Sequence, residues 1–547
     1  MAQAAAKAAP ASGTLRRELT YLDLLMTSLG GIIGSGWLYG SWKGAFMAGP
    51  AADLSWLIGG IAVLLIGLVY AELGGALPEA GAIVRYPQFS HGTFVSYIMG
   101  WGALIAYASV PPIEAEAAVQ FMGYYWPAVY STHTASLTTV GILMSVVFML
   151  LFFFINYFGI WVFGKTNTIW TLLKLAIPTL AVVVLLFGGH FNAANFGSYG
   201  GFTPLGTSGI FAAIPLGGII FAYLGFRQAL DLAGEAKNPQ RDVPRAVIGA
   251  IVIGVVLYIL LQTVWVGNMP AAQLAHGWAG TKGEFTAPFS DLSKFAGFGW
   301  LAVILLLDAI WSPAGTGNVY LASTSRVMHA MGKNRYFPKF LLWVHPKSGV
   351  PLWALVFTVV LGLAFLLPLP SWSALVGLVS NATVFTYIIG PVAVTVLRKT
   401  MPDMPRPFRL NGLGFFGPAA FVVASLILYW SGWAIDAPVA LILLIGVLLY
   451  AYGVTTFAED VEIYSWKYVK AGYWLVAYII AILILTYIGS SNFGAPHQII
   501  PYGWDMLVVA IVALGFYYWG VGSGIPTFES EAKLKEFAQA GKTASAD

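Results

Sequence analysis

Long apolar segments recur along the whole chain, and short polar segments separate them. A helix needs about 20 residues to cross the hydrocarbon core of a bilayer, and windows of about 19 residues detect such segments. The segments that qualify are residues 20–48, 54–76, 93–124, 137–157, 167–188, 208–233, 245–267, 298–331, 351–367, 372–397, 415–434, 438–456, 471–490 and 503–522. The pattern predicts an all-α membrane protein with about fourteen transmembrane helices.

The first apolar segment contains glycine at unusual density, in the stretch Leu29-Gly-Gly-Ile-Ile-Gly-Ser-Gly-Trp37. Every backbone N–H and C=O inside a bilayer must be satisfied, so an unwound stretch survives only where protein buries it or where it lines a cavity. A helix broken at this place predicts a binding site near the bilayer midplane.

The sixth segment shares this feature. The stretch Phe221-Ala-Tyr-Leu-Gly-Phe-Arg-Gln228 carries Gly225 and is followed by Gly234-Glu-Ala-Lys-Asn-Pro239. The first and sixth segments occupy corresponding positions if segments one to five and six to ten are inverted repeats. A single glycine more often serves close helix packing. The paired positions favour a second broken helix.

Composition agrees with a membrane protein and excludes several other classes. The chain of 547 residues is 59% hydrophobic and 9% charged, whereas soluble domains carry about 25% charged residues. The absence of cysteine excludes a disulfide framework, a thiolate metal cluster and a cysteine nucleophile. The seven histidines lack metal-ligand spacing, and no nucleophile elbow or phosphate loop occurs. We therefore expect no enzyme, no metal and no cofactor.

Basic residues are distributed unevenly between the two sides. With a cytoplasmic N-terminus, 22 of the 27 Lys and Arg residues fall in inside loops and tails, and Lys43, Lys282 and Lys294 fall outside. This is the positive-inside pattern of the cell membrane, and an even number of spans places both termini in the cytoplasm. The net charge of +4 follows from the same bias, so it gives no reason to expect nucleic-acid binding.

Five ionisable residues are singled out deep within the spans, whereas Glu72 and Asp231 lie nearer the cytoplasmic ends, where their side chains can reach the interface. An ionisable group there is costly unless it is paired or hydrated, so each is a functional candidate. The bases are Lys174 and Arg227, and the acids are Glu114, Glu116 and Asp308.

Several motifs stand in order along the chain: Ile33-Gly-Ser-Gly36, Tyr70-Ala-Glu-Leu-Gly74, Pro78-Glu-Ala-Gly81, Phe221–Gly225 with Gly234–Arg241, Ser325-Arg-Val327 with Pro338-Lys339, and Pro402-Asp-Met-Pro-Arg-Pro-Phe408. In sequence and order they resemble the amino acid–polyamine–organocation (APC) transporters, over roughly Leu19 to Arg409. The resemblance implies a leucine-transporter-like core of two inverted five-helix repeats with broken first and sixth helices, which carries substrate by alternating access.

The resemblance also divides the chain. Residues 1–18 are expected to form a cytoplasmic N-terminal tail and residues 19–410 the ten-helix transport core. Residues 411–522 then form four additional transmembrane helices, and residues 523–547 form a cytoplasmic C-terminal tail.

Unwinding at Gly34, Ser35 and Gly36 frees backbone N–H groups at the N-terminus of the outer half-helix. The orphan donors and the helix dipole favour an anion at such an end. We therefore expect the α-carboxylate of an amino acid substrate to bind there.

Carbonyl groups freed around Ile32, and at Phe221 and Leu224, suit the ammonium group of the same substrate. The residue that matches Phe221 in the family is an aromatic gate over the substrate, and Trp311 lies near a substrate-contacting tryptophan. Either aromatic side chain could instead serve packing alone. Gly225 completes the predicted site on the sixth helix.

Arg227 stands where related members often carry an acid. An arginine fork binds a carboxylate bidentately, so the substitution favours an acidic substrate such as aspartate or glutamate over a cationic one. The alternative is that Asp308 or a glutamate of the third span neutralises Arg227 within the protein. Neutral or broad-specificity uptake, and amino acid exchange, stay open.

Lys174 matches a lysine that some family members place where sodium-coupled relatives bind a cation. A buried ammonium can fill that position and release its proton during the cycle, which predicts proton coupling, with Glu114 and Asp308 as further coupling candidates. The alternative is a lysine that reaches the cytoplasmic interface.

The sequence thus predicts a secondary active amino acid permease of the cell membrane, working as a proton symporter. Its expected partners are a small amino acid, protons and the lipid bilayer. A transport-inactive amino acid sensor on the same fold is the alternative from another class. The oligomeric state does not follow from the sequence.

Overall fold

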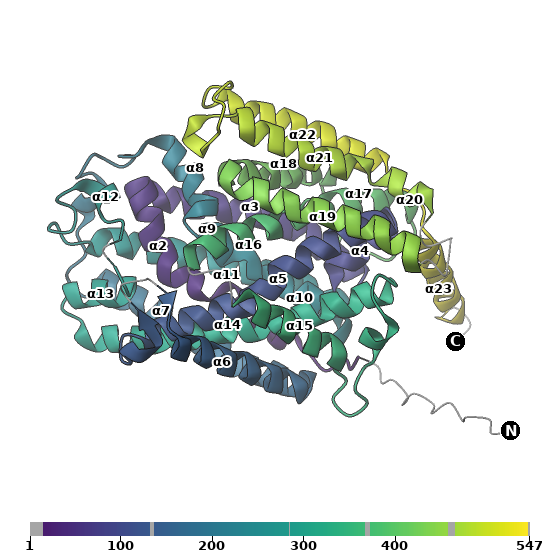
Figure 1. The fold of residues 1–547 in the computed structure, drawn as a ribbon, viewed down its shortest axis with the longest axis horizontal. Helices are drawn as coiled ribbons and strands as arrows, with labels where there is room; N and C mark the ends of the chain where they lie inside the picture. Colours follow the sequence, from purple (N-terminus) through teal and green to yellow (C-terminus); the bar gives the residue numbers. More distant parts are fainter. Residues whose placement is uncertain (1–14, 132–135, 284, 367–371, 458–464, 545–547) are drawn as a thin grey trace.

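The computed structural model describes residues 15–131, 136–283, 285–366, 372–457 and 465–544. Most helices run side by side along the long axis of the molecule (Figure 1). The described strands are β1 (Tyr130–Ser131) and β2 (Ser136–Leu137), which pair antiparallel. The chain is therefore almost entirely helical where it is ordered into regular elements.

The helices of the first half cover the first five predicted spans. They are α1 (Tyr21–Ile32), α2 (Ser35–Ala48), α3 (Ala52–Ala76), α4 (Ala82–Ser90), α5 (Thr93–Met122), α6 (Thr139–Tyr157) and α7 (Ile160–Phe187). The next five predicted spans hold α8 (Gly206–Leu216), α9 (Ile219–Tyr223), α10 (Gln228–Asp231), α11 (Pro239–Asn268), α14 (Gly299–Lys333), α15 (Leu352–Phe365), α16 (Trp372–Tyr387) and α17 (Ile389–Thr400).

The last predicted spans hold α18 (Leu413–Ser431), α19 (Trp433–Phe457), α20 (Trp466–Ala471), α21 (Tyr473–Ile488) and α22 (Trp504–Gly522). Helices outside the predicted spans are α4, α12 (Gly277–Gly280), α13 (Pro288–Phe295) and α23 (Phe528–Ala544), and α20 overlaps the predicted span 471–490 only at its last residue. Short 3₁₀ segments are η1 (Gly49–Ala51), η2 (Pro127–Val129), η3 (Ala193–Phe196), η4 (Leu224–Arg227), η5 (Ala233–Glu235), η6 (Lys339–Leu342) and η7 (Ser491–Phe493).

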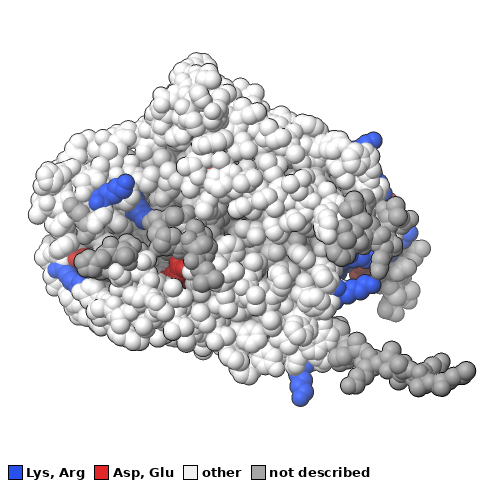
Figure 2. Space-filling model, viewed as in Figure 1, with Lys and Arg blue, Asp and Glu red and all other residues white. Residues whose placement is uncertain are grey.

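The helices are long and apolar enough for a multi-pass membrane protein. Within the described chain, 11 helices could cross a bilayer, or 12 if the bent pair formed by α8 and the segment Ile219–Asp231 counts as one span. Charged side chains on one face lie toward the two ends of the long axis, and most of the surface between them is uncharged (Figure 2). The count of fourteen spans and the inverted repeats stay predictions.

The first helix breaks where the glycines predict, over a shorter stretch. Only Ile33 and Gly34 separate α1 from α2, whereas Ser35 and Gly36 already belong to α2. A Cβ atom at Gly34 would lie 2.6 Å from the Thr316 hydroxyl, so this position has no room for a side chain. The break is therefore tightly enclosed by α14.

The sixth helix bends before the position that its sequence suggested. The axis turns by 48° between α8 and α9, where Gly218 adopts φ +80°, a conformation that favours glycine. Gly225 lies later, in η4, where a Cβ atom would stand 2.0 Å from the Gly31 carbonyl carbon. Gly225 therefore serves close packing of η4 on α1, and this packing brings the two irregular segments together.

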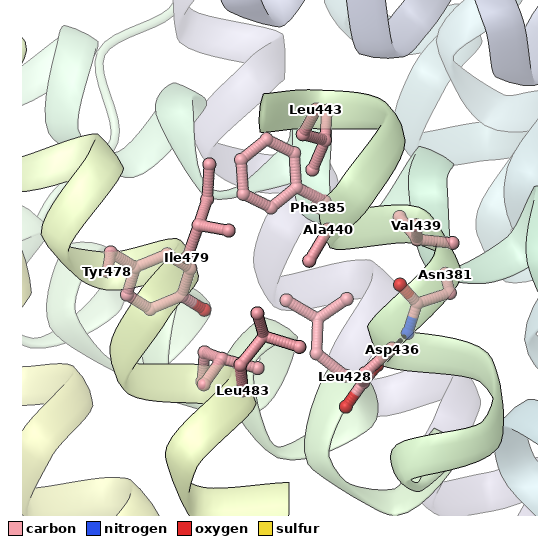
Figure 3. A pocket seen from close by; sticks show the side chains of 11 residues that line it. Asn381, Phe385, Leu428, Asp436, Val439, Ala440, Leu443, Tyr478, Ile479 and Leu483 are labelled. Atoms are coloured by element: carbon pink, nitrogen blue, oxygen red, sulfur yellow. Dashed lines mark hydrogen bonds between the residues drawn. The ribbon is translucent and has the colours of Figure 1, made fainter. Parts of the chain in front are cut away.

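The additional helices pack directly on the core. Helix α18 contacts α3 and α16, and α19 contacts α5. A small cavity of about 20 Å³ lies at this junction (Figure 3), where the Asn381 amide donates to the Asp436 carboxylate at 2.5 Å. The polar pair joins α16 to α19 within otherwise apolar surroundings.

The contact between Gly225 and Gly31 can be tested by adding one methyl group. Gly225→Ala should lower the thermal unfolding temperature of the purified protein, because overpacking a tight contact costs about 1–3 kcal/mol. Gly515→Ala is the matched control, since nothing lies within 4 Å of a Cβ atom at that helical position. Equal unfolding temperatures for the two variants would contradict the packing described here.

Candidate functional site

The C-terminal end of α1 is held by a buried lysine. Lys174, on α7, is 0% exposed, and its Nζ donates to the Gly30 carbonyl at 2.6 Å and to the Thr316 hydroxyl at 2.8 Å. The Thr316 hydroxyl in turn donates to the Gly30 carbonyl at 2.7 Å. Because the carbonyl end of a helix carries partial negative charge, an ammonium group stabilises it there.

The N-terminal end of α2 is held by a buried carboxylate. Glu114, on α5, accepts a hydrogen bond from the Ser35 backbone N–H at 2.9 Å and from the Ser35 hydroxyl at 3.0 Å. This is the chemistry expected for the carboxylate of a substrate, but a side chain of the protein supplies it here. Both ends of the broken helix are thus matched by opposite charge.

A second acid faces this region from α14. Asp308 is 1% exposed, and neither of its carboxylate oxygens has a hydrogen-bond partner among the described residues. Its charge and that of Glu114 both act on Lys174. The three coupling candidates therefore form one electrostatic group beside the break.

The carbonyl groups expected to receive the substrate ammonium already accept hydrogen bonds within the protein. Tyr258 donates to the Ile32 carbonyl at 2.7 Å, and Tyr387 donates to the Leu224 carbonyl at 2.9 Å. The Phe221 carbonyl accepts from the backbone N–H of Leu224. The Ile32 carbonyl also accepts from the Gly34 backbone N–H at 3.1 Å, so both of its lone pairs are used within the protein.

An indole covers the N-terminus of α2. The Nε1 of Trp372, at the start of α16, donates to the Ser35 hydroxyl at 2.7 Å. Its ring lies 4.7 Å from the Tyr39 ring and meets the Phe221 ring edge-on at 5.9 Å, between centroids. Phe221, the predicted gate, is thus part of an aromatic cover over the break.

Trp311 does not reach the break. Its side chain is 43% exposed and packs against Trp170, with ring centroids 4.6 Å apart and the rings tilted by 39°. It therefore lies on an outward side of α14, whereas Ser312, the next residue, donates to the Ile33 carbonyl at 3.1 Å. The structure does not bring Trp311 together with the other predicted site residues.

Arg227 is held in a cage of hydroxyl groups and rings. It donates to the Tyr107 hydroxyl at 2.5 Å and to the Thr386 hydroxyl at 2.8 Å. Its guanidinium lies 4.8 Å from the ring centroids of both Tyr107 and Tyr387. The acid whose charge acts on it is Asp231.

The alternative in which Asp308 or a glutamate of the third span pairs with Arg227 is wrong. Among the described residues, no ion pair joins it to Asp308, Glu114 or Glu116. Its Nη2 has no hydrogen-bond partner within that part of the chain. Contact of Arg227 with a substrate stays a prediction.

A buried ion pair ties the end of the sixth helix to α14. Arg326 binds Glu235 through two hydrogen bonds of 3.0 and 2.9 Å, and both side chains are at most 1% exposed. Breaking a buried pair leaves one charge uncompensated, which costs several kcal/mol. This pair therefore fixes η5 against α14 on one side of the broken helices.

The sequence interpretation missed Thr316, Ser312 and Trp372. Thr316 and Ser312 lie in the run Ser312–Asn318, where small and polar residues interrupt an apolar span. That interruption was an available signal, because hydroxyl groups within a span usually face polar partners. Trp372 gave no such signal, since tryptophan is common at the ends of membrane helices.

The family assignment follows from the whole length of the core. The model of the amino acid permease family matches residues 19–427. The chain therefore belongs to this family, within the APC superfamily, as its motifs indicated.

Curated relatives agree with this assignment. The chain is 40% identical to the glutamate/serine transporter AimA of Bacillus subtilis (strain 168), covering 94% of this chain and 95% of that protein. It is 38% identical to the aspartate-proton symporter of the same organism, covering 94% and 98%. The branched-chain amino acid permease BcaP of that organism is 29% identical over 80% and 93%. The protein is an amino acid permease.

The electrostatic partner of Arg227 can be identified by double-mutant cycles. Arg227→Met combined with Asp231→Asn should show a coupling of about 0.5–3 kcal/mol in thermal unfolding, because the two charges interact. The matched cycle of Arg227→Met with Asp308→Asn should be additive. Recovery of stability in that second double mutant would contradict the cage described here.

Proposed function

We propose that this permease takes up an acidic amino acid, aspartate or glutamate, together with protons. The names of two relatives, a glutamate/serine transporter and an aspartate-proton symporter, support this substrate class and this coupling ion. The leucine-transporter-like core of inverted repeats belongs to the same proposal, as does alternating access between two sides of the membrane.

The observation that carries the proposal is the carboxylate bound at the N-terminus of α2. Ser35 offers its backbone N–H and its hydroxyl, and Glu114 occupies both. A substrate α-carboxylate has the same charge and geometry as the Glu114 side chain. The substrate and Glu114 therefore compete for one anion site, which the substrate reaches only when Glu114 leaves it.

Competition for one anion site links the substrate to a proton. A protonated Glu114 carries no charge, so it yields the N-terminus of α2 to the substrate carboxylate. When the proton leaves on the cytoplasmic side, Glu114 becomes an anion again and displaces the substrate. Lys174 holds the end of α1 throughout, and Asp308 balances its charge.

The orientation of the protein in the membrane, with both termini in the cytoplasm, belongs to this proposal as well. Arg16 binds the Pro346 carbonyl beyond the end of α14, and Arg85 bonds both to Asn334 at that end and to Glu529 in α23. The first and last described segments thus lie at one end of the molecule, which supports termini on one side. The basic loops favour the cytoplasmic face of the cell membrane.

Neutral substrates are the second candidate, because one relative is named for serine as well as glutamate. Exchange of amino acids and a transport-inactive sensor are the remaining alternatives. Uptake of amino acid into sealed liposomes distinguishes a transporter from a sensor, because a sensor carries no substrate across the membrane. Dependence on internal amino acid separates exchange from symport.

Substrate class can be tested by competition. In proteoliposomes with an imposed inward proton gradient, aspartate and glutamate should inhibit uptake of labelled aspartate at far lower concentration than alanine or arginine. A charge-assisted contact to the side-chain carboxylate contributes about 1.5–3 kcal/mol that a neutral side chain lacks. A panel in which neutral amino acids compete best would end the acidic-substrate proposal.

Proton coupling can be tested by substituting two glutamates that lie close together on α5. Glu114→Gln should abolish the dependence of uptake on the proton gradient while aspartate binding persists, because the amide cannot exchange a proton at this pH. Glu116→Gln is the matched control, since Glu116 lies two residues away and is only half-buried. Gradient-driven accumulation by Glu114→Gln at the wild-type level would exclude Glu114 as the coupling residue.

Lys174→Met tests separately whether uptake requires a cation at the C-terminal end of α1. The variant should lose uptake altogether, because the Gly30 carbonyl then lacks its cation and the break loses its shape. Uptake and unfolding temperature are measured together. Wild-type uptake by Lys174→Met would contradict the role given to this lysine.

A further inference from the structure

Asp231, the last residue of α10, is a buried acid that the proposed transport cycle leaves without a role. The sequence placed it near the cytoplasmic interface, yet its side chain is 0% exposed. Neither carboxylate oxygen accepts a well-formed hydrogen bond from the described residues, although the Tyr107 hydroxyl and the Ile83 backbone N–H both act on its charge. An acid buried in this way within a membrane protein is a functional candidate.

Charged and titratable groups from several elements face Asp231. Among the described residues, the cation that acts on it is Arg227, on η4. Tyrosines on other elements respond to its charge: Tyr70 on α3, Tyr86 on α4, Tyr107 on α5, Tyr320 on α14 and Tyr387 on α16. A hydroxyl group can both donate and accept a hydrogen bond, so these surroundings can pass a proton.

Tyr320 links Asp231 to the anion site at the break of the first helix. The charges of Glu114 and Asp231 both act on the Tyr320 hydroxyl, and so does the Gln228 side chain. Both polar atoms of that side chain are buried without a well-formed hydrogen bond in the described chain, which is rare in folded proteins. Gln228 also packs on α1, since a Cβ atom at Gly31 would lie 2.9 Å from its Cγ. Tyr320 and Gln228 are therefore within reach of both the break and Asp231.

Tyr86 links Asp231 to the end of the molecule that is proposed to face the cytoplasm. The charges of Asp231 and Glu79 both act on the Tyr86 hydroxyl, which has no hydrogen-bond partner among the described residues. Glu79 pairs at 2.8 Å with Lys333, whose side chain is 51% exposed. The backbone N–H of Gly81 donates to the Asp231 carbonyl at 3.0 Å and holds this segment against the sixth helix. The groups around Asp231 thus extend to the hydrated surface.

We propose that Asp231 receives the proton that Glu114 releases and passes it to the cytoplasm. This inference rests on the proposed function, because it names the inner acid of the same proton-coupled cycle. The O–H bond of the Glu114 carboxyl breaks and one forms on an Asp231 oxygen, so the total charge does not change. The proton then leaves to water at the surface beyond Tyr86. Arg227 compensates the carboxylate that remains on Asp231.

A purely electrostatic role for Asp231, as the counter-charge of Arg227, is the alternative. An acid with that role alone is expected to bind the guanidinium in a fork, as Glu235 binds Arg326. Asp231 accepts no such bond among the described residues, and Arg227 donates to hydroxyl groups instead. The unpaired oxygens of Asp231 therefore suit an acid that takes up and releases a proton.

The test separates net uptake from exchange, because only net uptake requires the proton to leave on the cytoplasmic side. Uptake of labelled aspartate into proteoliposomes is measured with an inward proton gradient and no internal aspartate, and again at equal pH with aspartate inside. Net uptake by Asp231→Asn should fall about a hundredfold, since a positioned proton-transfer group contributes at least that factor. Exchange should stay close to the wild type, because it proceeds with the proton still on Glu114.

Asp53→Asn is the matched control and should keep both rates. Asp53 is an acid in the first turn of α3, and one of its oxygens is also buried without a partner among the described residues. Wild-type net uptake by Asp231→Asn would overturn the role of Asp231 alone, whereas a wild type without gradient-driven uptake of aspartate contradicts the proposed function itself. Equal losses of net uptake and exchange would show a structural role and overturn the inference. If Asp231→Asn does not fold, Asp231→Ser is measured in both assays and judged by the same outcomes.

Discussion

A helix that breaks inside a membrane exposes opposite partial charges at its two new ends, and the protein must neutralise both. In this permease, Lys174 binds the carbonyl end of α1 and Glu114 binds the amide end of α2. Neither charge could be buried alone without a large cost. The two helix ends therefore compensate the charges of Lys174 and Glu114, and these two charges in turn stabilise the helix ends. The rest of the site is built around these two contacts.

The packing around the break follows from this constraint. Backbone groups can be reached by buried side chains only where neighbouring elements come close, and small residues make that approach possible. Gly31 and Gly225 let η4 lie against α1, and Gly34 leaves room for the Thr316 hydroxyl. The aromatic cover made by Trp372, Tyr39 and Phe221 then excludes water, which strengthens every charge interaction beneath it.

Much of this arrangement could be read from the sequence, because hydrophobic length and glycine density act locally along the chain. The apolar segments, the first break and the buried Lys174 were all predicted from such local signals. The position of the second bend was not, since Gly218 and Gly225 both lie in the sixth segment and only packing against Gly31 separates their roles. The outward placement of Trp311 and the contacts of Trp372 depend on how distant helices meet. Lys43 was counted among the basic residues on the outer side, and its burial could not be seen there because sequence position alone does not show burial.

Competition between the substrate and Glu114 for one anion site can be measured directly. Calorimetric titration of aspartate into the purified protein, repeated in buffers of different ionisation enthalpy, reports how many protons binding takes up. At a pH where Glu114 is ionised in the free protein, we expect uptake of about one proton per aspartate, by linkage, and none for Glu114→Gln. Binding without proton uptake, or equal uptake by the wild type and Glu114→Gln, would contradict it.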